Sequence, residues 1–231
     1  MRTRVPASKE YPLLLSPRAA LAATALTALL ASSAWSAPAP TEAPNSQSDI
    51  AALLAKPAGL PDMVLGSATA PITVVEYSSL TCPHCAAFAE NVFPMLQQKY
   101  IDTGKVRFVS REFPLDLKAA AASILARCIA KEDAPKFFEV TMMMFHRQEE
   151  LVARTTDTLT DIGSKYGMSQ PDVEGCVKND AALDKLQADQ NFAYGQLKVQ
   201  ATPTFFINGE QVKGSMSFEE FEARLAPLLK H

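Results

Sequence analysis

The stretch that decides the fold is VVEYSSLTCPHCAAFAENVFPML, residues 74–96. An apolar, β-branched run precedes the two cysteines Cys82 and Cys85, and apolar side chains recur after them at three- and four-residue steps. The run predicts a buried strand, and the recurrence predicts a helix from Pro83 to about Tyr100. The two cysteines therefore stand where a strand passes into a helix.

This position favours a reactive thiolate at Cys82. Backbone N–H groups at a helix N-terminus lack partners and, with the helix dipole, they stabilise negative charge on sulfur. Pro83 suits the first helical turn, and His84 adds positive charge when protonated or donates a hydrogen bond. Cys85 lies one turn further on and can close a small disulfide ring. A Cys-X-X-Cys pair in this setting predicts a redox centre of the thioredoxin type.

Two other roles for the pair are less favoured. A zinc site needs four ligands, usually two such pairs, and the remaining cysteines, Cys128 and Cys176, stand alone. A purely structural disulfide between Cys82 and Cys85 would close only a very small loop and constrain the unfolded chain little. We therefore expect no bound metal.

The N-terminus has the pattern of a secretory signal peptide. Basic residues precede an apolar run at about 19–30, and small residues follow up to Ser36. An uncleaved membrane anchor is the alternative, but the run is short for a span that needs ~20 residues. We expect residues 1–36 to be cleaved and the protein to reach a bacterial-type periplasm, where paired cysteines are held oxidised.

The rest of the chain divides by its hydrophobic patterns. Strand signals bracket a long segment dominated by Ala, Leu, Lys, Glu and Met, which predicts helices, and Asn208-Gly209 predicts a hairpin near the C-terminus. The predicted parts are a tether with a short helix at 50–56 (37–59), a first α/β part (60–115), a helical insertion (116–190) and a second α/β part (191–231).

Two segments carry a family resemblance. EYSSLTCPHCAAF, residues 76–88, and QATPTFFINGE, residues 200–210, resemble the DsbA family of exported thiol–disulfide oxidoreductases. The resemblance runs from about Leu60 to the C-terminus. It implies an α/β thioredoxin fold with an inserted helical domain, and no bound cofactor, because the sulfur atoms carry the electrons.

The resemblance also assigns roles to residues. It implies that Cys82 is the exposed nucleophile that forms a mixed disulfide and that Cys85 is the partly buried resolving thiol. Thr202 and Pro203 match the family's cis-proline loop, which faces the cysteines and binds substrate backbone. A threonine before the proline places a hydroxyl near the sulfur atoms.

Glu76 is a charged residue inside an apolar strand, six residues before Cys82. One interpretation places it at a sheet edge with its carboxylate in water. The other makes it a buried acid beneath the disulfide, with a raised pKa, that exchanges a proton with Cys85. Its offset matches an acid of the family, which favours the second interpretation.

Cys128 and Cys176 both fall in the predicted insertion. In an exported protein they suggest a structural disulfide, whose loop of about 49 residues is worth roughly 4 kcal/mol. Two buried free thiols are the alternative.

Other polar or sulfur-bearing residues look structural. The run Met142–Met144 with His146 is interpreted as core packing rather than a copper site, because consecutive helical positions diverge. Arg107, Arg111 and Glu112 are interpreted as a solvated face or rim.

The expected function is disulfide donation to cysteine-containing exported polypeptides, with reoxidation by a membrane quinone-linked partner that the resemblance implies. The net charge of −3 gives no nucleic-acid footprint. Only about 20 residues separate the tether from the core, too few for a separate dimerisation domain, which favours a monomer; association through the segment IAALLAK, residues 50–56, is the alternative. The alternatives are an isomerase or reductase with the same centre and, in another class, a non-enzymatic binding module.

Overall fold

The computed structural model describes residues 46–56 and 59–230, all within a compact unit formed by residues 41–231. The expected signal peptide, 1–36, and most of the expected tether lie outside the described residues. No helix among residues 46–56 and 59–230 has the length and hydrophobicity needed to span a bilayer.

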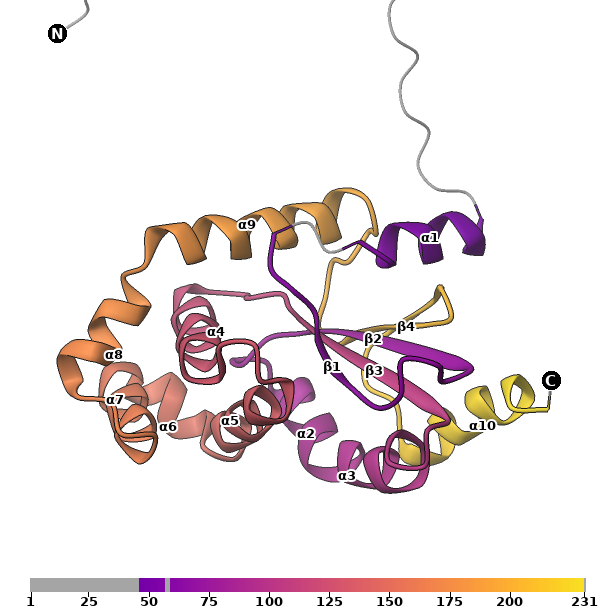
Figure 1. Ribbon diagram of the computed structural model, residues 1–231, viewed down its shortest axis with the longest axis horizontal. Coiled ribbons are helices and arrows are strands. Elements are labelled where there is room, and N and C mark those ends of the chain that lie inside the picture. Colours follow the sequence, from indigo (N-terminus) through magenta and orange to yellow (C-terminus); the bar gives the residue numbers. More distant parts are fainter. Residues whose placement is uncertain (1–45, 57–58, 231) are drawn as a thin grey trace, which may run out of the picture. The chain divides into compact units, whose positions relative to one another are not determined.

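A five-stranded sheet forms the centre of this unit (Figure 1). The strand order is β1-β3-β2-β4-β5, with β2 and β3 parallel and the other neighbours antiparallel. β2 is therefore the middle strand, hydrogen-bonded on both sides. The strands are β1 (Met63–Leu65), β2 (Ile72–Ser78), β3 (Val106–Glu112), β4 (Thr204–Ile207) and β5 (Glu210–Lys213).

The connection from β2 to β3 is helical, so the predicted strand–helix–strand unit is present. It consists of α2 (Pro83–Asn91), α3 (Phe93–Leu96) and the π-helical turn η1 (Gln97–Ile101). The single helix expected from Pro83 to Tyr100 is interrupted at Val92, where φ is −115°. Pro94 explains the interruption, because it has no N–H to continue the ladder and its ring displaces the preceding turn.

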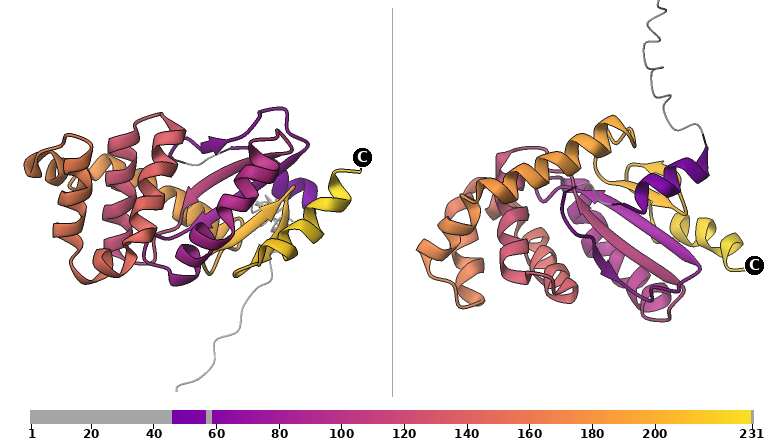
Figure 2. Two further views of the ribbon diagram at one scale, coloured as in Figure 1. Left: turned by 90° about the horizontal axis from the view of Figure 1, so that it is seen from below. Right: turned by 45° about the horizontal axis from the view of Figure 1, so that its top comes forward.

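Different sets of helices cover the two faces of the sheet (Figures 1 and 2). Helices α2, α3 and α10 (Phe218–Leu228) cover one face over a phenylalanine cluster, in which the rings of Phe88 and Phe205 lie 4.8 Å apart. The N-terminal helix α1 (Gln47–Leu54) and the end of α9 (Asp180–Gly195) cover the other face. Alternate residues of β2 therefore face different cores, with Val74 on the α2 side and Val75 on the α9 side.

The helical segment between β3 and β4 is the predicted insertion. Its α4 and α5 pack into the α2-side core, so the insertion and the sheet share one hydrophobic interior. α9 runs across the expected boundary between 190 and 191. The remaining helices are α4 (Leu117–Ala130), α5 (Ala134–His146), α6 (Gln148–Ala153), α7 (Thr155–Lys165) and α8 (Gln170–Val177).

The C-terminal hairpin and helix follow their local signals. Asn208 and Gly209 both have positive φ, 47° and 90°, as a tight hairpin turn requires. Asn208 also accepts a hydrogen bond from the Thr73 backbone N–H at 2.7 Å, which fixes the turn against β2. Ser217 and Glu220 form the capping box that begins α10.

Two features near the N-terminus differ from what the sequence predicts. Residues 46–49, expected within the tether, belong to the start of α1, because Ser46 and Asp49 form a capping box. The three-residue strand β1 was not predicted, since Met63–Leu65 is too short for alternation to show.

Candidate redox site

Cys82 and Cys85 lie at the start of α2, as the sequence predicts. Cys82 is the N-cap residue, with extended backbone angles (φ −88°, ψ 118°), and Pro83 occupies the first turn. Cys85 follows one turn later and is fully buried, while Cys82 is 4% exposed, so the expectations of an exposed Cys82 and a partly buried Cys85 were wrong for this reduced state. Both cysteines are free thiols in this structure. The sulfur atoms therefore occupy the positive end of a helix, within an otherwise apolar core.

The two thiols have opposite acidities. The pKa of Cys82 falls to about 5, chiefly because the Cys85 thiol donates a hydrogen bond to its sulfur, with help from Thr202 and the backbone N–H groups of Cys85 and His84. The pKa of Cys85 is raised, first by burial and then by Cys82 and Glu76. At neutral pH the reduced site therefore holds a thiolate at Cys82 and a thiol at Cys85.

Thr202 and Pro203 lie against the cysteines. The peptide bond between them is cis, and Cys82 Sγ donates a hydrogen bond to the Thr202 carbonyl oxygen at 3.3 Å. Thr202 is 8% exposed, and its Oγ1 forms no hydrogen bond with any residue that the structure describes. That hydroxyl nevertheless contributes to lowering the pKa of Cys82, because it lies close to the sulfur.

Glu76 is buried in the middle strand of the sheet, so the interpretation that placed it at an edge in water is wrong. It is 6% exposed, and it pairs with Ser110 of β3 on one side and Phe205 of β4 on the other. Burial raises its pKa to about 8, and the nearby Cys82 adds to the rise. Glu76 is therefore mostly protonated at neutral pH.

His84 is exposed, as is Pro83 before it, whereas Cys82 and Cys85 are buried. Its backbone N–H faces the Cys82 sulfur and helps to lower the pKa of Cys82.

Gln148, which the sequence analysis missed, connects the insertion to the active-site loop. Its side-chain Nε2 donates hydrogen bonds to the carbonyl oxygens of Leu80 and Cys82, each at 3.0 Å. Gln148 is the first residue of α6. A single glutamine at a helix start gives no sequence signal for this contact, because the two partners are more than sixty residues away.

Cys128 and Cys176 form a disulfide bond that joins α4 to α8, with their Cα atoms 6.1 Å apart. The pair is separate from the Cys82–Cys85 centre and staples the insertion together. Met144 is buried and Met142 and Met143 pack against the same core, which agrees with their interpretation as packing residues. The interpretation was wrong for His146, which is exposed, with its Nδ1 atom 3.2 Å from Glu90 Oε1. Within the described part of the chain, no group of three or more His, Cys, Asp or Glu is arranged to hold a metal ion.

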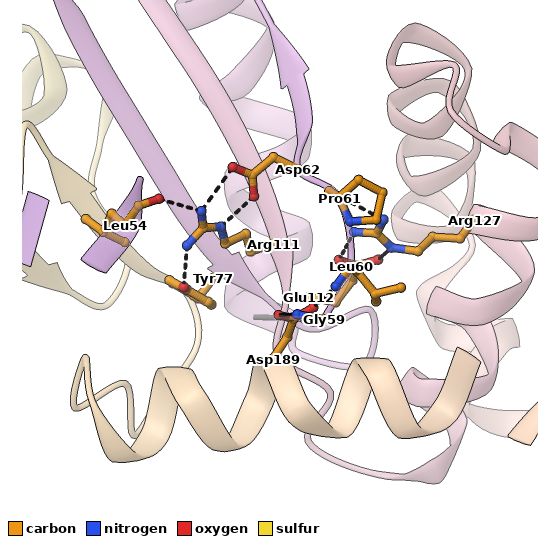
Figure 3. Close-up of polar contacts among 10 residues, drawn as sticks. All are labelled: Leu54, Gly59, Leu60, Pro61, Asp62, Tyr77, Arg111, Glu112, Arg127 and Asp189. Carbon is orange, nitrogen blue, oxygen red and sulfur yellow. Dashed lines mark hydrogen bonds and ion pairs between the residues drawn. The ribbon is translucent and has the colours of Figure 1, made fainter. Parts of the chain in front are cut away.

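Arg111 and Glu112 are buried, at 7% and 8% exposure, so their interpretation as a solvated rim was wrong. Figure 3 shows the network that satisfies Arg111. Its guanidinium donates two hydrogen bonds to Asp62, one to the Tyr77 hydroxyl at 2.9 Å and one to the Leu54 carbonyl at 2.6 Å. Buried charges persist only when paired and hydrogen-bonded in this way.

Arg127 and Asp189 hold the same N-terminal segment, which leads into β1. Glu112 forms a two-pronged ion pair with Arg127 of α4, and Arg127 also donates to the Pro61 carbonyl (Figure 3). Asp189 of α9 accepts the backbone N–H groups of Gly59 and Leu60 at 2.6 and 2.7 Å. The segment that leads into β1 is therefore clamped from β3, α4 and α9.

Comparisons with known proteins agree with this geometry. The family model described as thioredoxin matches residues 59–226. The curated protein named "Putative protein-disulfide oxidoreductase" from Rickettsia bellii is 40% identical over 154 residues, which cover 66% of this chain and 59% of that protein. "Disulfide bond formation protein D" from Bacillus subtilis is 26% identical over 171 residues, covering 72% of this chain and 77% of that protein.

Among solved structures, the crystal structure of alpha-DsbA1 from Wolbachia pipientis is similar at a TM-score of 0.69. It is 31% identical, and the match covers 74% of this chain and 92% of that one. The chain spans 59% of the length of the Rickettsia relative.

The sheet order, the dithiol at a helix N-terminus and the facing cis-proline define a thioredoxin-fold protein with a helical insertion. The chain belongs to the thioredoxin family and, within it, to the DsbA family.

Proposed function

We propose that this protein is an exported oxidant that donates its Cys82–Cys85 disulfide to cysteine-containing polypeptides. The observation that carries the proposal is the division of acidity in the reduced pair, with a low pKa at Cys82 and a raised pKa at Cys85. A stabilised Cys82 thiolate stabilises the reduced form, so the disulfide gives up its oxidising equivalents readily.

The reaction has two exchange steps. A substrate thiolate attacks Cys82 Sγ, the disulfide breaks, and its electron pair leaves on Cys85 Sγ. A second substrate thiolate then attacks the substrate sulfur of the mixed disulfide and expels Cys82 as a thiolate. The substrate gains one disulfide, and the protein keeps both electrons as a reduced pair. Glu76, buried and protonated at neutral pH, is the acid that supplies a proton to Cys85.

Surface apolar side chains beside the site support a polypeptide substrate. Leu115 and Leu117 are 53% and 83% exposed. They lie next to the active-site loop, because the Leu115 N–H donates to Ser79 Oγ and Thr81 donates to Asp116. Exposed apolar residues of this size suit the extended, partly apolar chains that need disulfides before they fold.

The proposal also covers the export of the protein, its reoxidising partner and its oligomeric state. The N-terminal sequence pattern supports export to a periplasm, and the reduced pair requires reoxidation, which we assign to a membrane quinone-linked oxidase. A monomer is favoured by α1, because Leu54 is buried and Ile50 and Leu53 pack against the protein's own second core rather than facing outward. The proton and electron chemistry needs no cofactor, since sulfur supplies both redox states.

The test is trapping of the mixed disulfide. Oxidised protein is mixed with a reduced, unfolded protein that contains two cysteines, and the products are separated without reductant after acid quenching. The wild type should transfer one disulfide per molecule. Cys85→Ser, first converted at Cys82 to its mixed disulfide with 5-thio-2-nitrobenzoate, should exchange that leaving group for a substrate thiol and form a covalent complex through Cys82. Cys82→Ser, treated in the same way, should do neither. Equal complex formation by the Cys82→Ser variant would refute the assigned nucleophile.

A further inference from the structure

A small cavity lies under the active-site helix, on the α2 side of the sheet. Its volume is about 30 Å³, which exceeds the roughly 10–15 Å³ that one water molecule needs. Part of its wall is phenylalanine, but polar side chains also line it. The polar residues that line it are Glu76 and Ser78 of β2, Ser110, Arg111 and Glu112 of β3, Ser123 of α4 and Thr141 of α5.

Ser78 is the member of this group without an evident structural role. It is 9% exposed, and its Oγ forms no hydrogen bond with any residue in the described ranges. Leaving a buried hydroxyl unpaired costs stability, so such a group calls for an explanation. Ser78 follows Glu76 by two residues on β2, which places both side chains on the face that Cys85 covers.

Ser78 lies within reach of both ends of a proton transfer. Its hydroxyl is close enough to the Glu76 carboxyl and to the Cys85 thiol to lower the pKa of each. A serine hydroxyl donates one hydrogen and accepts others, and it rotates about its Cβ–Oγ bond. It can therefore accept a proton from one neighbour while it gives its own to the other.

The other charged groups near this face form ion pairs or hydrogen bonds with other residues. Glu112, which pairs with Ser78 across β3, holds Arg127 through both carboxylate oxygens (Figure 3). Arg111 points to Asp62 and Tyr77 on the opposite face. The titratable groups facing Ser78 are thus Glu76 on its own strand, Cys82 and Cys85 from α2, and the paired Glu112.

We propose that Ser78 relays a proton between Cys85 and Glu76 during disulfide exchange, an inference that rests on the proposed function. When the disulfide opens, the departing Cys85 sulfur takes the hydrogen of Ser78 Oγ, and Ser78 takes the proton of the Glu76 carboxyl. When the disulfide closes, Cys85 gives its proton to Ser78, and Ser78 gives its own to Glu76 in its carboxylate form, which is the minor form in the reduced protein at neutral pH. Each cycle returns Glu76 and Ser78 to their starting states.

The test resolves the reactions of Cys82 and Cys85 as two successive kinetic phases. Full-length protein, reduced at its Cys82–Cys85 pair, is mixed with excess 5,5′-dithiobis(2-nitrobenzoate), and release of the coloured thiolate is followed by stopped flow. The first, concentration-dependent phase is attack by Cys82. The second, concentration-independent phase is expulsion of the second thiolate by Cys85, which must lose its proton.

We expect Ser78→Ala to leave the first phase unchanged and to slow the second on the order of tenfold. This loss is smaller than the 10²–10⁴ of a complete general base, because water in the cavity substitutes for part of the relay. Ser78→Thr, which keeps the hydroxyl, should restore the second phase. Ser123→Ala is the matched control, since Ser123 is 2% exposed and lines the same cavity.

A measurement on the wild type keeps the inference testable if Ser78→Ala does not fold. Two protons move together in a relay, so the second-phase rate should depend quadratically on the deuterium fraction of the solvent, whereas direct transfer gives a straight line. Loss of the first phase in the wild type would contradict the proposed function itself. A normal first phase with a linear wild-type dependence, or with an unchanged second phase in Ser78→Ala, would overturn only the relay.

Discussion

Cys82 Sγ lies 3.3 Å from the carbonyl oxygen of Thr202, to which the thiol form donates a hydrogen bond, although 120 residues separate them in sequence. The contact joins the first half of the thioredoxin unit to the second, across the whole helical insertion. It places the residue before the cis-proline beside the reactive sulfur. Under the proposed function, we expect a polypeptide bound at Cys82 also to contact the backbone of this loop.

The acidity of Cys82 provides the first prediction. Thiolate absorbance of the reduced protein should titrate with a pKa of about 5. Cys85→Ala should raise that pKa by at least about one unit, because it removes the principal hydrogen-bond donor to the thiolate. Thr202→Val, which removes a lesser contributor, should raise it less. A wild-type titration near the ordinary cysteine value would show that the site does not stabilise the thiolate.

The same shift makes the stability of the reduced protein depend on pH. The folded pKa of Cys82 lies below the unfolded value, so the stabilisation is complete above the unfolded pKa of about 9 and is lost as pH falls through about 5. The oxidised protein has no Cys82 thiolate and lacks this contribution. On acidification from pH 7 to 5, the denaturation midpoint of the reduced form should therefore fall relative to that of the oxidised form.

Glu76 gives the opposite pH dependence. Its folded pKa of about 8 lies above the unfolded value of 4.5, so folding favours the protonated acid. The stability that this acid supports is complete below 4.5 and declines as pH rises to about 8. Glu76→Gln should therefore stabilise the protein by roughly 3 kcal/mol at pH 7 and have little effect at pH 4. Urea unfolding at the two pH values measures this, and equal effects at both would mean that Glu76 ionises normally.

The Arg111–Asp62 pair predicts a large stability loss. The two side chains are 8% and 16% exposed, so Arg111→Met leaves a buried carboxylate unpaired and should cost about 3 kcal/mol or more. The double variant Arg111→Met/Asp62→Leu should recover most of that loss, because no unpaired charge remains. Lys178→Met, which breaks an exposed pair with Glu174, is the control and should not move the urea midpoint. A small effect of Arg111→Met alone would show that the network is not structural.

Local signals predicted much of the fold and site. The Asn208-Gly209 turn depends on neighbours in sequence and formed as predicted, and the capping box at Ser217 and Glu220 is a local feature of the same kind. The start of α2 at Cys82 is likewise a local property of strand, proline and helix. The positions of Thr202 and Pro203 against the cysteines came from family resemblance, since nothing within their own segment indicates that contact.

The errors concern residues whose partners are distant in sequence. Arg111 looked solvated because a charged residue near a strand end usually is, but Asp62 and the Leu54 carbonyl, far upstream, pair with it. Asp189 and Gln148 act the same way, each binding backbone groups of a remote segment. A pattern along the chain shows which side chains are polar, and only the packed fold shows which of them find partners.

The central claim is that Cys82–Cys85 is an oxidising disulfide, and its equilibrium with glutathione tests this most directly. The measurement uses the Cys128→Ser/Cys176→Ser variant, so that only one disulfide responds. We predict a potential well above the roughly −270 mV of thioredoxin, towards the roughly −120 mV of DsbA. A value near that of thioredoxin would contradict the account and assign the site to a reductase or isomerase.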